Sequence, residues 1–117
     1  RRRTILDSLY QSAAARMADV DAVLTPTVVI TPPTIESLEP EGAYPKANMH
    51  ALRNTVIANF LGLCALTLPV GKDAAGMPVG LQVLAGPWQD AKLLAIGQAI
   101  ENELGSGLEI LGQPPAV

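Results

Sequence analysis

Apolar residues recur at helical spacing in three segments of the chain, residues 4–19, 48–61 and 90–104. In each segment they follow one another at intervals of three or four residues, which places them on one side of a helix. We therefore predict three amphipathic helices. Their apolar stripes are Leu6, Leu9, Ala13, Met17 and Val20; Met49, Leu52, Val56 and Phe60; and Leu93, Ile96, Ile100 and Leu104.

Polar residues and glycines stand at the ends of these stripes. Thr4, Asn48 and Asp90 precede the apolar positions, and their side chains can accept hydrogen bonds from the first free backbone amides of a helix. Gly62 and Gly105 follow the second and third stripes, where glycine commonly ends a helix. We expect Thr4, Asn48 and Asp90 to be N-caps, and we expect Gly62 and Gly105 to terminate their helices.

Three shorter segments, residues 21–26, 64–70 and 77–85, have the composition of strands. The second and third are nearly continuous apolar runs, which predicts burial on both faces, as in a sheet sandwiched between helices. Residues 71–76 separate them, and Asp73 suits the turn of a hairpin. Strands interspersed with helices predict an α/β fold.

Residues 27–47 form a proline-rich loop between the first strand and the second helix. Pro32 and Pro33 are adjacent there, so we expect little regular structure. A loop of this length in a compact protein usually serves a function or covers a neighbouring domain. The end of the chain, residues 112–117, is expected to be a frayed tail.

Composition narrows the classes of function. Half of the 117 residues are apolar, so a core is expected, and with only four aromatic residues it must be aliphatic. The net charge is −3, and three of the eight basic residues are Arg1, Arg2 and Arg3, so the rest of the chain is clearly acidic. An acidic surface argues against a nucleic-acid partner. No apolar run reaches the roughly 18 residues of a membrane span, so we expect no membrane partner either.

The single cysteine, Cys64, excludes a disulfide within the chain and fits a reducing, cytoplasmic compartment. It lies in an apolar run, so we interpret it as an inert core thiol. A dyad of Cys64 with His50 is a poor alternative, because the cysteine follows a helix C-terminus, whose dipole disfavours a thiolate. One histidine and one cysteine cannot supply a zinc site, and no glycine pattern for a phosphate cradle occurs, so we expect no metal and no cofactor.

A serine hydrolase would need His50, the only histidine, as its base. None of the serines lies in a Gly-x-Ser-x-Gly elbow, so we interpret His50 as an exposed helical residue. The acidic positions of the proline-rich loop are expected to be solvated rather than paired for catalysis. The serines are Ser8, Ser12, Ser37 and Ser106, and the acidic residues are Glu36, Glu39 and Glu41.

Three motifs in order resemble the C-terminal region of the amidase signature family. They are "DAVLTPT" at residues 21–27, "NFLGLCALTLPVG" at residues 59–71 and "GMPVGLQVLAG" at residues 76–86. Leu63, Cys64 and Ala65 form a variant of the second motif, similar to that of some bacterial amidases and allophanate-hydrolase-like members. The resemblance implies that residues 1–117 are a C-terminal segment of an amidase-signature domain, part of an α/β/α sandwich with a mixed sheet.

The resemblance also implies a Ser-cis-Ser-Lys triad that cleaves a small-molecule amide by acyl transfer. The Gly/Ser-rich stretch that carries the two serines of this triad is absent, and Lys46, Lys72 and Lys92 have no matching context. No catalytic residue can therefore be assigned in this chain. For contact with substrate we predict the turn that follows the "TPT" motif, together with Asn54 and Thr55 of the second helix.

Two readings of the function stay open. The chain is either an inactive C-terminal piece of an amidohydrolase or a binding or oligomerisation module derived from the same fold. Strands buried on both faces need neighbours to cover them, which favours the first reading. The unpaired strand edges predict homo-oligomers of the isolated chain. The chain begins with Arg1 rather than Met, and from this we expect a cut or partial chain.

Overall fold

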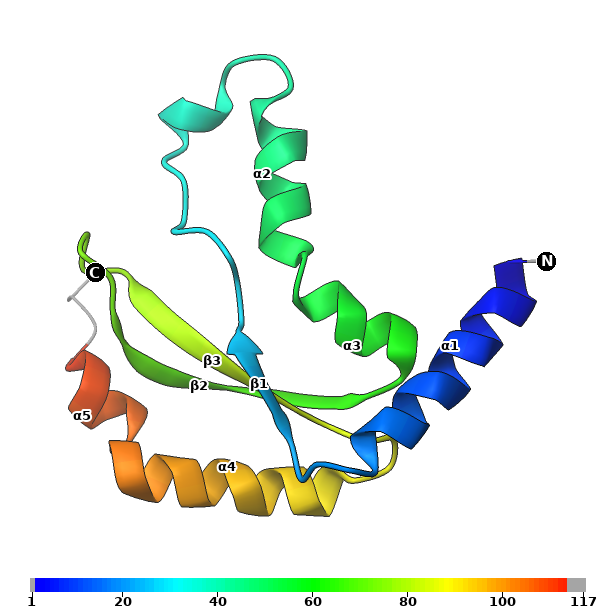
Figure 1. Cartoon of the computed structure of the whole chain (residues 1–117). Helices are drawn as coiled ribbons and strands as arrows, with labels where there is room; N and C mark the ends of the chain where they lie inside the picture. The colour runs from blue at the N-terminus through cyan, green and yellow to red at the C-terminus, as the bar shows by residue number, and fades with distance from the viewer. Residues whose placement is uncertain (1, 114–117) are drawn as a thin grey trace.

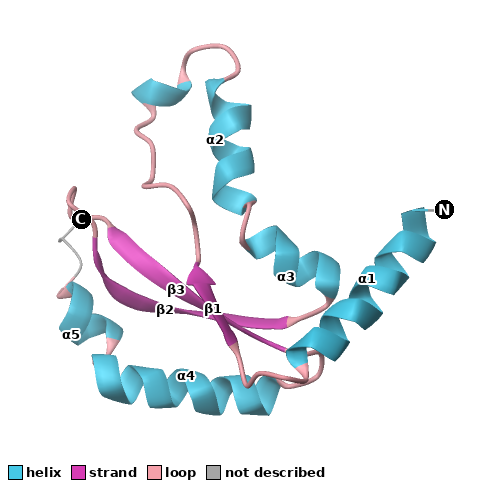
Figure 2. Cartoon of the chain, viewed as in Figure 1, coloured by secondary structure: helices cyan, strands magenta, loops and turns pink. Residues whose placement is uncertain are grey.

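The computed structural model describes residues 2–113 as a three-stranded sheet with helices around it (Figures 1 and 2). The α/β class and the three strands are confirmed. Five α-helices are present in this range where the sequence predicted three. The elements are α1 Arg2–Met17, β1 Val23–Pro26, the 3₁₀ turn η1 Glu36–Leu38, α2 Ala43–Leu52, α3 Thr55–Leu61, β2 Cys64–Lys72, β3 Pro78–Ala85, α4 Asp90–Leu104 and α5 Gly107–Leu111.

The strands are ordered β1-β3-β2, and both pairings are antiparallel. The predicted α/β/α sandwich with a mixed sheet, of which these three strands would be a part, stays a prediction. The hairpin between β2 and β3 is confirmed, with a bulge between Pro69 and Gly71. A short turn is enough to connect two antiparallel neighbours, whereas a parallel pair would need a crossover helix.

One face of the sheet is covered by α4 and α5, and we call it the α4 face (Figure 1). Val83 and Ala85 of β3 are fully buried there and pack against Leu93 of α4. Gly97 lets the helix approach β2 closely, because a Cβ at this position would lie 2.8 Å from Cδ2 of Leu66. The predicted stripe of α4 is confirmed at Leu93, Ile96 and Ile100, which belong to this core, whereas Leu104 is exposed.

The opposite face, which we call the open face, carries Val23, Thr25, Ala65, Thr67, Gln82 and Leu84. Gln82 and Leu84 are buried in the central strand, but Ala65 and Thr67 on the neighbouring strand are exposed. The prediction that both hairpin strands are buried on both faces is therefore wrong for β2, whose exposure alternates along most of its length. The apolar sequence of β2 therefore forms a strand with more hydrophobic surface than the rest of this chain covers.

Residues 28–53, which we call the arm, stand away from the sheet (Figure 1). The arm contains η1 and α2, so the expectation of little regular structure across residues 27–47 is only partly right. Asn48, predicted as an N-cap, lies inside α2, because that helix already begins at Ala43. Pro45 is tolerated in its first turn, where a backbone amide has no partner in the helix.

The predicted helix of residues 48–61 is broken into α2 and α3 at Arg53 and Asn54. The Asn54 side chain donates a hydrogen bond to the Pro26 carbonyl at the end of β1, 2.6 Å away, which ties the break to the sheet. Gly62 is confirmed as the end of α3, with the left-handed φ of 60° that favours glycine. Gly105 is likewise confirmed as the end of α4.

Two other predicted caps differ from the structure. Thr4 lies within α1, which begins at Arg2, and Gln89 rather than Asp90 is the N-cap of α4. The sequence analysis missed α5. Ser106 and Glu109 form a reciprocal capping box there, a local signal that supports even a five-residue helix.

The N-terminal helix α1 packs on α3, and the ring of Tyr10 lies so close to Gly62 that a Cβ there would overlap it. Most of the predicted apolar stripe of α1 is uncovered, with Leu6 and Leu9 exposed and only Ala13 and Met17 half-buried. Within residues 2–113, no helix is both long and apolar enough to cross a membrane. Residues 114–117 of the predicted tail lie outside the described residues.

Candidate functional site

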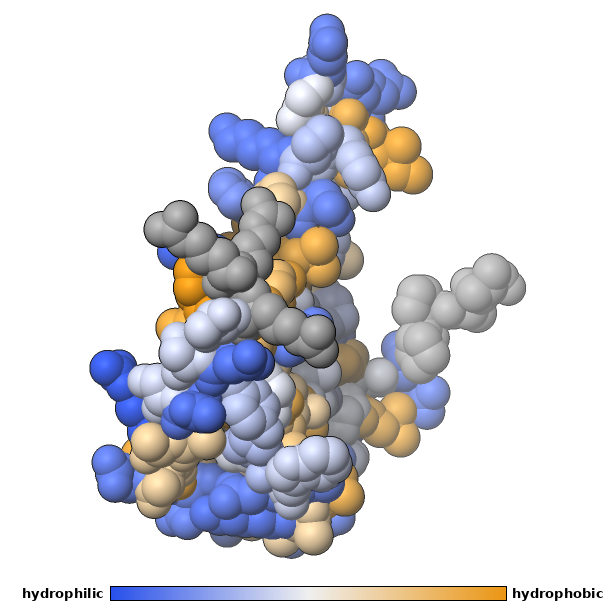
Figure 3. Space-filling view, turned by 90° about the vertical axis from the view of Figure 1, so that its right-hand side faces the viewer, coloured by the Kyte–Doolittle hydropathy of each residue, from blue (hydrophilic) through white to orange (hydrophobic). Residues whose placement is uncertain are grey.

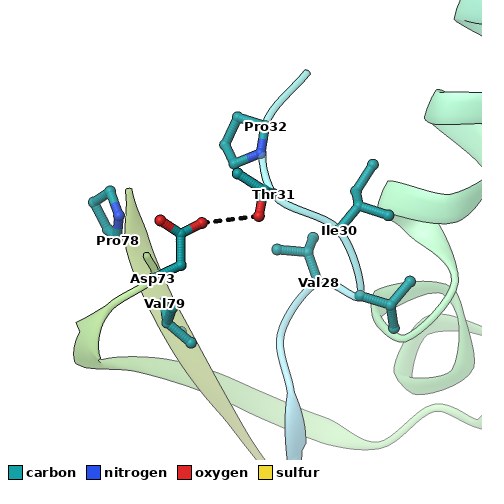
Figure 4. A pocket seen from close by; sticks show the side chains of 9 residues that line it. Val28, Ile30, Thr31, Pro32, Asp73, Pro78 and Val79 are labelled. Carbon is teal, nitrogen blue, oxygen red and sulfur yellow. Dashed lines mark hydrogen bonds between the residues drawn. The ribbon is translucent and has the colours of Figure 1, made fainter. Parts of the chain in front are cut away.

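A small pocket of about 200 Å³ lies between the start of the arm and the hairpin (Figure 4). The arm contributes residues 28–32, the segment directly after the "TPT" motif, and the hairpin contributes Asp73 and residues 78–80. Apolar side chains dominate the lining, and Asp73 is its only ionisable residue. The sequence predicted a substrate contact in this turn, and the structure has a pocket there.

The pocket forms where the chain after β1 separates from β3 and then contacts the hairpin again at Asp73. The Thr27 amide donates to the Gly80 carbonyl at 2.9 Å, which is the last backbone contact of this pairing. Beyond it the chains part, and Thr31 Oγ1 donates to Asp73 Oδ2 at 2.8 Å (Figure 4). We call this hydrogen bond the Thr31–Asp73 clasp. The two contacts hold the segment that lines the pocket to β3 and to the hairpin turn.

Asp73 also organises the hairpin turn. Its Oδ1 accepts hydrogen bonds from the backbone amides of Ala75 and Met77, each at 2.9 Å. The hydrogen bond from Met77, followed by that from Thr31, lowers the pKa of Asp73 below its ordinary value of 3.8. The pocket therefore has one anionic edge at neutral pH, and the same carboxylate fixes the position of the turn.

Gly80 lies beside the pocket and allows two threonines to meet across β3. A Cβ at Gly80 would lie 2.7 Å from Thr27 Oγ1 and 3.0 Å from Thr67 Oγ1. These two hydroxyls are hydrogen-bonded to each other, and Thr67 Oγ1 also donates to the Leu81 carbonyl at 3.3 Å. Glycine is needed here for space rather than for backbone freedom.

The two predicted substrate residues, Asn54 and Thr55, do not line this pocket. Asn54 donates to the Pro26 carbonyl, and the Thr55 hydroxyl donates to the Leu52 carbonyl at 3.2 Å. Both side chains are half-buried at the root of the arm. Asn54 thus holds the arm to the end of β1, and a contact of either residue with substrate stays a prediction.

The serines and the histidine do not form a triad in the described part of the chain. Ser37, Lys46 and His50 line a shared hollow of about 340 Å³ in the arm. The Ser37 hydroxyl donates to the Thr34 carbonyl at 2.7 Å, so its proton is directed away from any base. Ser106 caps α5. None of these serines has a hydrogen bond to His50 among residues 2–113.

Cys64 is half-buried and packs against the α4-face core, in keeping with an inert thiol. Across the described range, no group of three His, Cys, Asp or Glu side chains is arranged to hold a metal ion. An ion pair joins Lys92 to Asp21 at 2.9 Å, and Lys92 lowers the pKa of Asp21. This pair links the start of α4 to the segment before β1, away from the pocket.

A larger groove of about 620 Å³ lies between the hairpin turn and α5. Met77, Leu108 and Leu111 contribute to a mostly apolar lining, and Lys72 is its only ionisable residue. The smaller pocket is the better candidate site because it adjoins the "TPT" motif and carries fixed hydrogen-bonding groups. Its lining gives a small apolar group contacts with apolar side chains and with one carboxylate, that of Asp73.

Sequence reasoning missed the Thr31–Asp73 clasp and the polar contacts around Gly80. Asp73 was identified as a turn residue, but nothing local connects it with Thr31, which lies 42 residues earlier. Thr25 and Thr27 alternate with apolar residues along β1 and its short extension. This alternation could have suggested a polar face that also includes Gln82 and Thr67 on the neighbouring strands.

The chain matches known proteins over most of its length. The Amidase family model matches residues 1–94. The chain is 46% identical over 114 residues to 2-amino-5-chloromuconic acid deaminase of Comamonas testosteroni, covering 97% of this chain and 25% of that protein. It is 42% identical over 85 residues to a fatty acid amide hydrolase of Oryza sativa subsp. indica, covering 71% of this chain and 14% of that protein.

Solved structures agree with these sequence matches. A crystal structure of an amidase superposes with a TM-score of 0.71 at 31% identity, covering 86% of this chain and 23% of the other. A glutamyl-tRNA(Gln) amidotransferase component of Thermotoga maritima superposes with a TM-score of 0.66 at 32% identity, covering 97% of this chain and 23% of the other.

The chain thus spans about a quarter of the length of its first curated relative and of these two solved structures. The matched region nevertheless includes most of the present sequence and all three signature-like motifs. On this evidence the chain belongs to the amidase signature family.

Proposed function

We propose that this chain forms the C-terminal part of an amidohydrolase that cleaves the C–N bond of a carboxylic amide by serine acyl transfer. In this chemistry a serine attacks the amide carbonyl, its proton passes to a base, and backbone amides stabilise the resulting oxyanion. The single observation that carries the proposal is the family match over residues 1–94. The serines and the lysine that the family resemblance implies have no counterpart in this sequence, so they are expected in other parts of the protein.

The class of substrate is drawn from the names of the relatives. They are a 2-amino-5-chloromuconic acid deaminase, a fatty acid amide hydrolase and a glutamyl-tRNA(Gln) amidotransferase. All three names refer to removal or transfer of a nitrogen-containing group. We propose a small-molecule amide, with the Leu63–Ala65 variant of the second motif bearing on which one. A cytoplasmic location and a homo-oligomeric state stay predictions.

The pocket beside the Thr31–Asp73 clasp is proposed as part of the wall that receives the apolar portion of the substrate. Val28 and Val79 face it from the arm and from β3 (Figure 4). A volume of about 200 Å³ suits a small aliphatic or single-ring group rather than a long acyl chain. Asn54 and Thr55 are proposed to support this wall from the root of the arm and to approach the substrate.

The test uses a chimera in which this chain replaces the matching quarter of the Comamonas deaminase, next to the 117-residue chain alone. We expect C–N hydrolysis by the chimera and none by the chain alone. In the chimera, Val79→Phe should fill the pocket and lower kcat/KM for bulky substrates more than for small ones, whereas Leu94→Phe on the outside of α4 should not.

Two results would contradict the proposal. One is turnover by the isolated chain that His50→Ala abolishes, since this would place the catalytic base here. The other is a folded chimera without any C–N hydrolase activity, which would favour a binding or oligomerisation module.

A further inference from the structure

We propose that the open face of the sheet, together with α1, α3 and the arm, docks the remaining body of an amidase domain and not a second copy of this chain. The proposal rests on the proposed function for the identity of the partner. It adds the surface that is used and the polar contact that sets its position.

The chain exposes far more surface than a self-contained protein of its mass. Its accessible surface is 8604 Å² for 12.2 kDa, whereas a compact monomer of this mass would expose about 6,000 Å². Its radius of gyration is 16.8 Å, compared with about 13 Å for a compact chain of this length. The excess, roughly 2,500 Å² on one partner, has the size of an obligate interface.

The exposed surface has the chemistry of an interface. Each of the four aromatic residues is at least one-third exposed, with Phe60 at 60% and Trp88 at 91%. Aromatic side chains are the usual energetic centres of interfaces, and here none of them is in the core. Figure 3 shows hydrophobic side chains at the surface of both the projecting arm and the body below it. Exposed apolar residues of α1, α3 and the arm include Ile5, Leu6, Leu9, Ile57, Phe60, Ile35 and Met49.

The outer side of α4 is different and serves as a reference. Its exposed positions include Lys92, Gln98, Asn102 and Glu103, which is the composition of a solvated helix face. Leu94 and Leu104 are exposed apolar residues of this helix, at 67% and 51%. More than half of the large hydrophobic residues that are exposed in the described chain nevertheless lie on α1, α3 and the arm.

The open face also contains a polar row that is incomplete. Thr25, Gln82 and Thr67 lie directly opposite one another on β1, β3 and β2. Gln82 is only 4% exposed, and the Thr25 hydroxyl donates to its Oε1 at 3.2 Å. Among residues 2–113 no hydrogen bond is seen from Gln82 Nε2, and this nitrogen is not one of the atoms fully shielded from solvent. A segment that covers this face would remove that access to solvent, so we infer that it supplies a hydrogen-bond acceptor to Gln82 Nε2.

The comparisons favour the amidase body over a second copy as the occupant. The chain superposes with TM-scores of 0.71 and 0.66 on segments that are 23% of much longer chains. Its open shape, with the arm standing off the sheet, is thus the shape that this region has within a larger body. Association with a second copy would not explain why the chain has the shape of these segments.

The experiment measures cysteine labelling in the chimera, read peptide by peptide with mass spectrometry. Phe60→Cys and Thr67→Cys are compared with Leu94→Cys and Gln98→Cys. Phe60 and Leu94 are matched, at 60% and 67% exposure, and Thr67 and Gln98 are both exposed in this chain. We expect maleimide to label the positions on α3 and the open face at least about tenfold more slowly than the two α4 positions, because a covered thiol reacts only when the covering segment opens locally.

Equal labelling of matched positions in the folded chimera would overturn the docking proposal. So would slow labelling at Phe60 and Thr67 that becomes fast on dilution as a dimer dissociates, because the occupant would then be a second copy. A chimera that does not fold would also count against it, since the surface would not fit an amidase body. Slow labelling without enzymatic turnover would leave the docking surface standing and contradict only the proposed function. Turnover with fast labelling at Phe60 and Thr67 would support the proposed function and contradict the docking surface.

Discussion

The two faces of the three-stranded sheet differ in how completely the chain itself covers them. On the α4 face, Val83 and Leu66 meet Leu93 of a helix from the same chain, and the core is aliphatic and closed. On the open face, Gln82 and Thr67 are the neighbours of those residues along the strands, and the surface there is polar and only partly covered. Adjacent residues on one strand therefore face, in turn, a closed hydrophobic core and a surface that the chain covers only in part.

This difference shows where the stability of the isolated chain originates. The α4 face buries apolar side chains against helices that the chain itself supplies, so its contribution is present without a partner. The open face holds the buried Gln82 and Leu84 beside the exposed Ala65 and Thr67, so part of its contribution depends on what covers it. Substitutions on the two faces should separate these contributions.

The largest effect is expected from Leu93→Ala on the α4 face. Leu93 is 3% exposed, and its truncation leaves a cavity in a small core, so we expect a loss of about 3 kcal/mol in the free energy of unfolding. The neighbouring Leu94→Ala is the control, since Leu94 is 67% exposed and should change stability by less than about 0.5 kcal/mol. Urea unfolding measures both. Similar losses for the two variants would contradict the closed α4 face.

Overpacking the same face should have the next largest effect. In Gly97→Val the first added carbon would lie 2.8 Å from the Leu66 side chain, so α4 must shift away from β2 or Leu66 must change rotamer. We expect a loss of about 2 kcal/mol. Ala99→Val, at an exposed position of the same helix, controls for the lower helix propensity of valine. Thermal unfolding of the two variants should differ clearly, and equal melting temperatures would show that α4 is not tightly packed.

The sequence predicted the elements whose signals are local and periodic. The helix of residues 90–104, its apolar stripe at Leu93 and Ile96, and the glycines that end α3 and α4 were found in this way. The break between α2 and α3 could not be predicted from periodicity, since it depends on Asn54 reaching the Pro26 carbonyl 28 residues earlier. The false prediction of burial on both faces of β2 has another cause. The pattern reports how hydrophobic a strand is, not whether this chain supplies the cover.

The candidate site was predictable only in outline. The "TPT" motif located the turn, and Asp73 was identified as a turn residue, but the pocket arises where these two distant segments meet. Asn54 and Thr55 were chosen because they are polar residues beside an apolar stripe. Side chains of this kind equally suit hydrogen bonds to the backbone, which is the role that both have in this structure.

The capping box of α5 offers a smaller test of the α4 face. The Glu109 amide donates to Ser106 Oγ at 3.4 Å, and the Glu109 carboxylate accepts a bond from the Ser106 amide. Ser106→Ala should cost about 1 kcal/mol and loosen α5 over β2. Ser106→Thr retains the hydroxyl and should restore most of the stability. Faster hydrogen exchange in residues 107–111 of the alanine variant alone would support this role, and unchanged exchange would contradict it.

Gln82 tests the open face directly. In the 117-residue chain, Gln82→Leu removes the acceptor of the Thr25 hydroxyl, and we expect a loss of about 1 kcal/mol. The double variant Gln82→Leu/Thr25→Val should be nearly neutral, because both polar partners are replaced by apolar groups. In the chimera the double variant should be less stable than the parent, since the covering segment would lose its bond to Gln82. A neutral result in both proteins would show that the polar row is a feature of this chain alone.

The smallest expected effect is a pH dependence from Asp73 at the edge of the open side. Hydrogen bonds from Met77 and Thr31 lower the pKa of Asp73 in the folded chain below its ordinary 3.8, so the carboxylate stabilises the fold above about pH 4. This contribution should be lost as the pH falls through the lowered pKa. Thr31→Val removes one of these bonds, so the pKa of Asp73 should rise toward its ordinary value and the acid dependence should weaken. Thr31→Ser, which keeps the hydroxyl, should restore it. An NMR titration of the Asp73 carboxyl in the three proteins measures the effect directly, and identical curves would mean that the clasp does not hold the arm to the hairpin in solution.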